Sequence, residues 1–151
     1  MPLLSVLING VPSKPFNPSR GIRQGDPLST FLFILMSKGL GRMLSNARAT
    51  RSLKGLSLHD HTPLTHQQFV DDNLLMGNPS IQEAISINET LETFSKSSGI
   101  TINKDKSQIY FFNTHVITQR NISRILGFTI STFPSKYLGD PLISFALKKY
   151  S

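Results

Sequence analysis

The longest helical pattern in the chain begins near residue 26. Apolar residues recur at spacings of three and four positions from Leu28 to Ala47, which predicts one core-forming amphipathic helix that ends near Arg48. Asp26 is a suitable N-cap, and Pro27 suits the first helical position because its missing N–H is not needed there. We therefore expect this helix to begin at about Asp26.

A second helical pattern covers about Pro79 to Ser98. Ser80 and Glu83 have the spacing of a capping box, and Gly99 is the kind of residue that ends a helix. A shorter helix is expected over residues 115–126.

Short extended segments lie between these helices. Residues 3–8 predict a strand that turns at Asn9-Gly10. Asp71 and Asp72 lie between two apolar stretches, which predicts a β-hairpin with both charges at its tip. Further extended segments are expected at Ile100–Ile102, Gln108–Phe112 and Tyr137–Ile143. This order of elements favours an α+β fold with an antiparallel sheet.

Composition narrows the functional classes. The 151 residues suit one domain, and a net charge of +7 favours a polyanionic partner, with nucleic acid ahead of an anionic membrane surface. The chain has no cysteine, which excludes disulfides and thiolate metal sites and fits an intracellular protein. The sequence shows neither a long apolar run nor a convincing signal peptide, so we expect no membrane span.

The pair Asp71-Asp72 is the main candidate for chemistry. Adjacent carboxylates repel each other, so in a partly apolar setting they need a proton or a cation. Mg²⁺ takes oxygen ligands, and polymerases use such pairs to hold two metal ions for phosphoryl transfer. The alternative is a solvated turn, which the Asp-Asn dipeptide also suits.

The stretch RGIRQGDPLS at residues 20–29 is the most specific local pattern. Its glycines allow a ligand close to the backbone, and Arg20 and Arg23 offer positive charge to phosphates beside a helix N-terminus. A capped helix that follows a basic loop explains the same residues. The histidines His59, His61 and His66 fit an exposed polar loop better than a metal site.

Four blocks in order resemble the reverse transcriptases of non-LTR (LINE-type) retrotransposons, most closely those of plant genomes. The blocks are RGIRQGDPLS, the Phe69–Asp72 hairpin, the stretch Ser98–Ser107, and LGF at 126–128 followed by FPSKYLG at 133–139. An ordered set of motifs is far more specific than any one of them. The resemblance implies an RNA-directed DNA polymerase, a nucleotidyltransferase with a polymerase palm, of which the chain holds a truncated part with some of the fingers.

The resemblance also implies roles for single residues. Asp71 and Asp72 would bind the catalytic Mg²⁺ or Mn²⁺ ions, and Lys106 would lie near the nucleotide phosphates as a general acid. Nucleotide and template contacts would come from Arg20, Arg23, Gln24 and Gly25. The primer end would lie near Tyr137, Leu138 and Gly139. The partners would be an RNA template, a DNA primer and deoxynucleoside triphosphates.

Some positions depart from the family pattern. Val70 replaces a small alanine, a mild change in a strand position, and Asp140 places a charge where an apolar residue is usual. Before Asp71 the chain has only Asp26 and Asp60, and neither matches the family's upstream carboxylate block. A two-metal site needs such a further carboxylate, so we expect negligible polymerase activity from the chain alone.

We expect a partial reverse transcriptase domain at residues 1–143 and a truncated tail at 144–151. An exposed sheet edge and apolar face would favour self-association. The alternatives are a non-catalytic basic remnant that binds nucleic acid and a related enzyme such as an intron-encoded maturase. An intracellular location is expected, with the nucleus as one candidate compartment.

Overall fold

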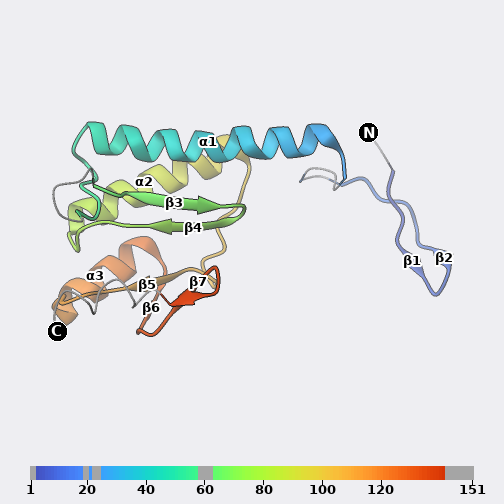
Figure 1. Cartoon of the computed structure of the whole chain (residues 1–151). Coiled ribbons are helices and arrows are strands. Elements are labelled where there is room, and N and C mark those ends of the chain that lie inside the picture. The colour runs from blue at the N-terminus through green and yellow to red at the C-terminus, as the bar shows by residue number, and fades with distance from the viewer. Residues whose placement is uncertain (1–2, 19–20, 22–24, 58–62, 142–151) are drawn as a thin grey trace. The chain divides into compact units, whose positions relative to one another are not determined.

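The computed structural model describes residues 3–18, 21, 25–57 and 63–141. In this part of the chain three helices alternate with short strands (Figure 1): α1 (Pro27–Ala49), α2 (Ile81–Ser98) and α3 (Val116–Leu126). The strands are β1 (Leu7–Ile8), β2 (Val11–Pro12), β3 (His66–Phe69), β4 (Asp72–Leu75), β5 (Gln108–Tyr110), β6 (Thr129–Ser131), β7 (Lys136–Tyr137) and β8 (Asp140–Pro141). The expected α+β mixture of helices and strands is confirmed.

The chain forms two compact units, Met1–Met36 and Ser37–Ser151, and α1 runs through the boundary between them. The first unit contains the β1–β2 hairpin, whose turn is the predicted Asn9-Gly10 pair with φ of 50° and 82°. Both residues have positive φ, as a two-residue hairpin turn requires. Among the residues described, no helix is long and apolar enough to cross a membrane.

The strands pair two by two instead of forming one sheet. The pairs β1–β2, β3–β4 and β7–β8 are antiparallel, as expected, but β5 and β6 are parallel. The reason is that α3 connects β5 to β6 and returns the chain to run in the same direction.

Two of the predicted extended segments are wrong. Residues 100–102 form no strand, because Gly99 at φ 74° reverses the chain after α2 and a turn follows at residues 104–106. The segment from Tyr137 is a hairpin instead of one extended piece, since Leu138 and Gly139 have φ of 54° and 91° and separate β7 from β8. Residues 142 and 143 lie outside the described part of the chain.

The predicted helix caps at Asp26 and Ser80 are confirmed, but Glu83 does not close the capping box on the Ser80 N–H. The Asp26 Oδ1 atom accepts a hydrogen bond from the Leu28 N–H at 2.9 Å. At the start of α2, Ser80 Oγ accepts from the Glu83 N–H at 3.2 Å. The Glu83 carboxylate is buried and accepts from the Asn78 N–H at 3.0 Å, so it caps the segment before the helix.

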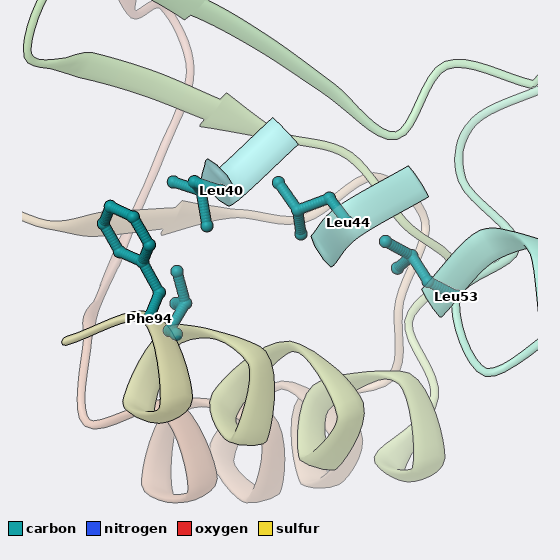
Figure 2. Packing of buried hydrophobic residues seen from close by; sticks show 5 residues of the cluster. Leu40, Leu44, Leu53 and Phe94 are labelled. Atoms are coloured by element: carbon teal, nitrogen blue, oxygen red, sulfur yellow. The ribbon is translucent and has the colours of Figure 1, made fainter. Parts of the chain in front are cut away.

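The core of the second unit joins the later half of α1 to α2. Leu40 and Leu44 of α1 pack with Leu91 and Phe94 of α2 and with Leu53 of the loop after α1 (Figure 2). A second cluster joins α2 to α3 through the buried residues Ala84, Ile122 and Leu126. Both clusters share the partly buried Ile87 and Phe128, which makes the core continuous.

The first half of α1 is not part of the core, contrary to the prediction. Leu28 is 61% exposed, Phe31 63% and Leu35 57%. The apolar spacing that predicted burial is present, but the buried cluster contacts this helix only from Leu40 onward.

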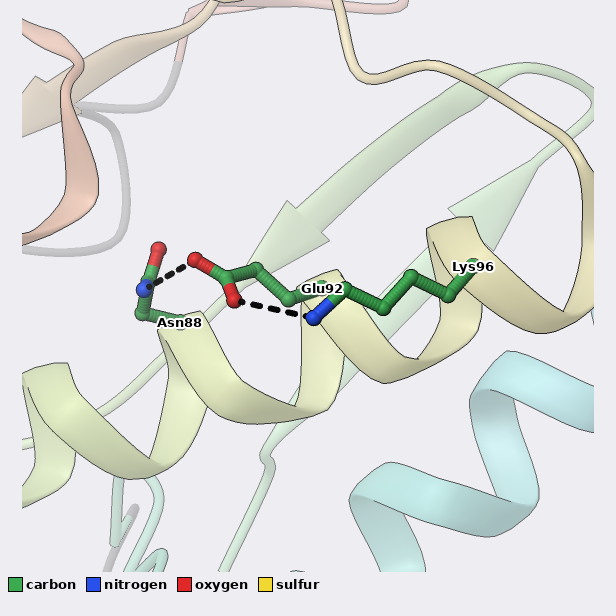
Figure 3. A network of polar contacts seen from close by, with 3 residues as sticks. All are labelled: Asn88, Glu92 and Lys96. Atoms are coloured by element: carbon green, nitrogen blue, oxygen red, sulfur yellow. Dashed lines mark hydrogen bonds and ion pairs between the residues drawn. The ribbon is translucent and has the colours of Figure 1, made fainter.

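The solvent face of α2 carries a small polar network (Figure 3). Asn88 Nδ2 donates to Glu92 Oε1 at 3.0 Å, and Lys96 Nζ lies 3.7 Å from Glu92 Oε2. Successive residues of this network are four positions apart and lie on neighbouring turns, so their contacts stabilise the helix itself. Because the ion pair is largely exposed, it contributes no more than about 0.5 kcal/mol.

Replacing Leu44 by alanine tests the core. Leu44 is 0% exposed, so Leu44→Ala leaves a cavity and should lower the free energy of unfolding by about 2–5 kcal/mol. The matched change Leu35→Ala on the same helix should cost less than about 1 kcal/mol in dilute solution. Chemical denaturation followed by circular dichroism measures both, and equal losses would contradict the described core.

Candidate functional site

Asp71 and Asp72 lie at the tip of the β3–β4 hairpin, as the sequence predicts. Phe69 pairs with Asp72 in register, so Val70 and Asp71 form a two-residue turn. Both carboxylates are exposed. Asn73 secures the tip: its Nδ2 donates to the Asp71 carbonyl at 3.1 Å, and its Oδ1 accepts from Gln68 Nε2 at 3.0 Å. Two carboxylates are thus presented to solvent on a closed turn.

Val70 lies in the turn instead of in a strand, which corrects the prediction. Its φ is 50°, in the left-handed region that a β-branched residue rarely occupies. Such a conformation costs about 1–3 kcal/mol. A positive φ at this position is what a tight two-residue hairpin needs, so the hairpin keeps its short turn at the expense of local strain.

The base of the hairpin is fixed to the core and to α1. Leu75 packs against the cluster that contains Leu44. The partly buried His66 and Gln68 lie against Gly41, where an added Cβ would be 3.3 Å from His66 Nε2 and 3.0 Å from Gln68 Oε1. Burial lowers the pKa of His66. His66 is therefore part of a packed strand, and the expected exposed loop is wrong for this residue.

Tyr137 of β7 is linked to the hairpin by electrostatics. Its hydroxyl oxygen is buried and has no hydrogen-bond partner in the described structure. Burial, and then the negative charge of Asp72, raise the pKa of Tyr137. The structure thus brings a residue from the end of the described chain within the electrostatic influence of the hairpin.

An aromatic cluster supports the segment that leads into β7. The ring of Phe133 stacks on Phe112 with centroids 4.3 Å apart and lies 5.0 Å from the ring of Tyr110. Ser135 Oγ donates to the Tyr110 hydroxyl at 2.7 Å. These contacts attach residues 133–135 to β5 and its continuation, and so they limit where Tyr137 can lie.

The carboxylates present do not make a complete metal centre. Within the described ranges, no group of three or more His, Cys, Asp or Glu residues could hold a metal ion. Asp26 is engaged as a helix cap, and Asp60 lies outside those ranges. Asp71 and Asp72 could supply some of the oxygen ligands that a divalent cation needs, but not the ligand set of two ions.

Neither of two surface cavities encloses the hairpin tip. A groove of about 360 Å³ lies between α1 and α2 and is lined by residues such as Asn46, Thr50 and Glu89. A smaller cavity of about 130 Å³ is lined by residues that include Leu91, Lys104 and Phe128. Asp71, Asp72 and Tyr137 line neither of them, and the two carboxylates are exposed at the hairpin tip.

Comparison with known protein families shows to which family the chain belongs. The family model described as reverse transcriptase (RNA-dependent DNA polymerase) matches residues 2–139. The chain belongs to the reverse transcriptase family. This finding confirms the family resemblance of the four sequence blocks, and it assigns the chain to a family of RNA-directed DNA polymerases, which are nucleotidyltransferases.

A curated relative is an uncharacterized mitochondrial protein of Arabidopsis thaliana. It is 41% identical to this reverse transcriptase chain over 70 residues, which are 46% of the chain and 57% of the relative. The chain therefore spans little more than half the length of the curated relative that it matches.

The block that contains Lys106 serves a local structural purpose in this reverse transcriptase. Asn103 Oδ1 accepts from the Lys106 N–H at 3.1 Å, and the Asn103 carbonyl accepts from Ser107 Oγ at 2.8 Å. These bonds shape the turn before β5 and leave the Lys106 side chain exposed. In the described structure no hydrogen bond or ion pair joins Lys106 to the hairpin carboxylates.

The basic block before α1 is described only in part. Gly25 is exposed at φ 81°, a conformation that favours glycine. Arg20, Arg23 and Gln24 lie outside the described residues, so their expected contacts with nucleotide and template stay predictions.

Sequence reasoning missed two features that shape the site. Gly41 allows the close contact of α1 with the hairpin, and the hydroxyl of Tyr137, a residue assigned to the primer end, lies within the influence of Asp72. Gly41 carries a usable signal, because a glycine inside a helix costs about 1 kcal/mol relative to alanine and so implies a packing reason. The electrostatic influence of Asp72 on Tyr137 has no such local signal in the sequence.

Removing the charge of Asp72 tests the geometry. In Asp72→Asn the pKa of Tyr137 should fall from its raised value, because one cause of the shift is lost. Asp71→Asn is the matched control and should leave that pKa unchanged. Ultraviolet absorbance of the tyrosinate, with Tyr137→Phe to assign the signal, measures the change.

The same shift has a consequence for stability. Because folding raises the pKa of Tyr137, the contribution of its neutral phenol is present below the ordinary pKa of 10.0 and is lost as pH rises through the raised value. In an Asp72→Asn chain the pKa of Tyr137 is raised less, so this contribution to stability should be lost at a lower pH. An unaltered titration of Tyr137 in this variant would contradict the placement of β7.

Proposed function

We propose that this chain is a palm segment of a non-LTR retrotransposon reverse transcriptase, with the β3–β4 turn as its catalytic hairpin. One observation carries the proposal: two adjacent exposed carboxylates lie at the tip of a two-residue turn, within the residues that match the reverse transcriptase family. The tight turn keeps both carboxylates at the tip and accessible to a cation.

The proposed roles follow the motif positions. Asp71 and Asp72 would contribute oxygen ligands to Mg²⁺ or Mn²⁺, whose chemistry in polymerases is to neutralise the charge that develops on the transferred phosphoryl group. Lys106, as an exposed ammonium group, would donate a proton to the departing pyrophosphate. Tyr137, Leu138 and Gly139 would lie near the primer end, and the basic block Arg20–Gly25 would contact nucleotide and template.

We also propose that the chain alone has no polymerase activity. Two carboxylates supply only part of the ligand set of two divalent ions, and Asp26 is engaged as a helix cap. A further carboxylate from outside this chain would have to complete the site.

A second candidate function rests on charge. The net charge of +7 supports binding to RNA or DNA through phosphate contacts, with or without catalysis. If the chain retains only this property, it is a non-catalytic nucleic-acid-binding remnant of the family.

A primer-extension assay separates these functions. With an RNA template, a DNA primer, deoxynucleoside triphosphates and either Mg²⁺ or Mn²⁺, the purified chain should extend no more primer than Asp71→Asn does. In the same samples, binding to the primer–template should weaken with salt, by a log–log slope of about 0.7–0.9 per neutralised phosphate.

Primer extension tests the incomplete metal site, and binding to the primer–template tests the role of the positive charge. Template-directed extension by the natural chain that is lost in Asp71→Asn would contradict the incomplete site. Binding without salt dependence, or no binding, would contradict the role of the positive charge. Asp71→Asn should bind nucleic acid at least as well as the natural chain does, because it removes one negative charge.

A further inference from the structure

The outward side of α3 carries a row of positive charges. Arg120 and Arg124 are four positions apart on this helix, and both are exposed. At about 100° per residue, these arginines and Gly127, which caps the helix, fall within an arc of roughly 60°. The buried Ile122 and Leu126 point roughly 150° away from the middle of this arc, into the cluster shared with α2. The arginines therefore lie on the outward side of a helix that the core holds in place.

Lys104 extends this row at the C-terminal end of α3. A Cβ atom added to Gly127 would lie 3.0 Å from Lys104 Nζ and 3.3 Å from its Cδ, so the glycine leaves room for the lysine side chain. The dipole of the helix favours a cation at this end. Arg120, Arg124 and Lys104 together are called the basic row below. None of the three is a residue to which the family resemblance assigns a role.

Few acidic residues lie near the basic row. Residues 99–136 include five Lys or Arg residues and one acid, the exposed Asp105. Helix α3 itself has no Asp or Glu. Glu92 lines the same small cavity as Lys104, but its carboxylate pairs with Lys96. In the part of the chain that the structure describes, no ion pair involves a residue of the basic row.

The helix dipole explains only part of this arrangement. Arg124 lies in the last turn of α3 and Lys104 lies beside its end, where cations stabilise the helix. Arg120 lies a full turn earlier, where the effect of the dipole has faded. Three cations on one face without acidic partners repel one another, and a polyanion would relieve that repulsion.

From these features we propose that the basic row binds phosphate groups of the primer–template duplex. The proposal rests on the proposed function, because membership in the reverse transcriptase family is what favours nucleic acid over other polyanions. From Arg120 to Gly127 the helix rises by about 10 Å. This length corresponds to about three nucleotides of one strand at about 3.4 Å each, so each cation can meet its own phosphate.

Such contacts would position the duplex without reading its sequence. A guanidinium group can donate two parallel hydrogen bonds to one phosphate, and the Lys104 ammonium group would act as a point charge. The basic row uses no residue of the β3–β4 hairpin, so it can bind nucleic acid whether or not the metal centre is complete.

Binding of a labelled RNA–DNA duplex to the full chain tests the basic row. Fluorescence anisotropy between about 50 mM and about 200 mM salt gives the log–log slope of affinity against salt. In the variant with Arg120→Gln and Arg124→Gln the slope should fall by about 2, or about 1 for each lost phosphate contact. Affinity at about 0.1 M salt should fall by roughly tenfold or more. Glutamine has nearly the helix propensity of arginine, and circular dichroism checks that α3 remains.

A matched variant removes the same charge elsewhere. Arg51 and Lys54 are exposed in the loop after α1, within the same compact unit as α3. Arg51→Gln combined with Lys54→Gln should change the slope by less than about 0.5, because these residues lie outside the basic row. An equal fall of the slope in both double variants would overturn the proposed surface and assign binding to diffuse charge.

Lys104 is tested by charge removal and by a conservative change. Lys104→Gln should lower the slope by about 1, and Lys104→Arg should preserve it, because arginine keeps the charge. A role limited to the end of α3 would instead lower the stability of Lys104→Gln and leave its salt slope unchanged. That result would contradict the extension of the row to Lys104.

The remaining outcomes separate this proposal from the proposed function. If the natural chain does not bind the duplex, the basic row and the charge-based candidate function both fail, while the assignment of the hairpin stands. If the variant with Arg120→Gln and Arg124→Gln binds as the natural chain does, the basic row alone is overturned. Phosphatidylserine vesicles test an anionic membrane: vesicle binding lost in this variant, with duplex binding unchanged, would also overturn the proposal.

Discussion

The packing of Leu40 and Leu44 against α2 is the interaction on which the position of the hairpin depends. Leu75 at the end of β4 lies against the same cluster, and His66 and Gln68 of β3 lie against Gly41 one position beyond Leu40. The base of the hairpin is therefore held by the core, while the residues at its tip are exposed to solvent. The packing of Leu75 in the core fixes the base of the hairpin. The two-residue turn that begins at Val70 forms the exposed tip, which carries the carboxylates.

The predictions that hold depend on residues close together in the chain. Asp26, Ser80 and Gly99 are recognisable as helix caps because a cap needs only its own turn, and the hairpin tip is recognisable from alternation and turn chemistry. The failures involve distant partners. Helical spacing predicts an apolar face in α1 but not whether another element covers it, and local propensity does not distinguish a parallel pair from an antiparallel one. The approach of β7 to Asp72 depends on the whole second unit, so no local pattern predicts it.

The chemistry of the hairpin follows from what surrounds its charges. Both carboxylates remain in water, where their repulsion is screened, and the described residues place no third acid with them. The nearby phenol of Tyr137 stays neutral at ordinary pH and does not compensate their charge. Membership in the reverse transcriptase family is therefore compatible with an incomplete ligand set, because we propose that the chain supplies only the hairpin of the site and that residues outside the chain complete it.

The most direct test of the incomplete metal centre is the binding of Mn²⁺ to the isolated chain, followed by paramagnetic broadening of its amide NMR signals. We expect broadening centred on Asp71 and Asp72, with weak affinity in the millimolar range (about 1 mM), since two carboxylates supply only part of a ligand set. Asp71→Asn combined with Asp72→Asn should abolish it. A tight site with affinity of about 1 µM at the hairpin would contradict the incomplete centre, and broadening elsewhere that leaves the hairpin unaffected would contradict its assignment as the metal-binding element.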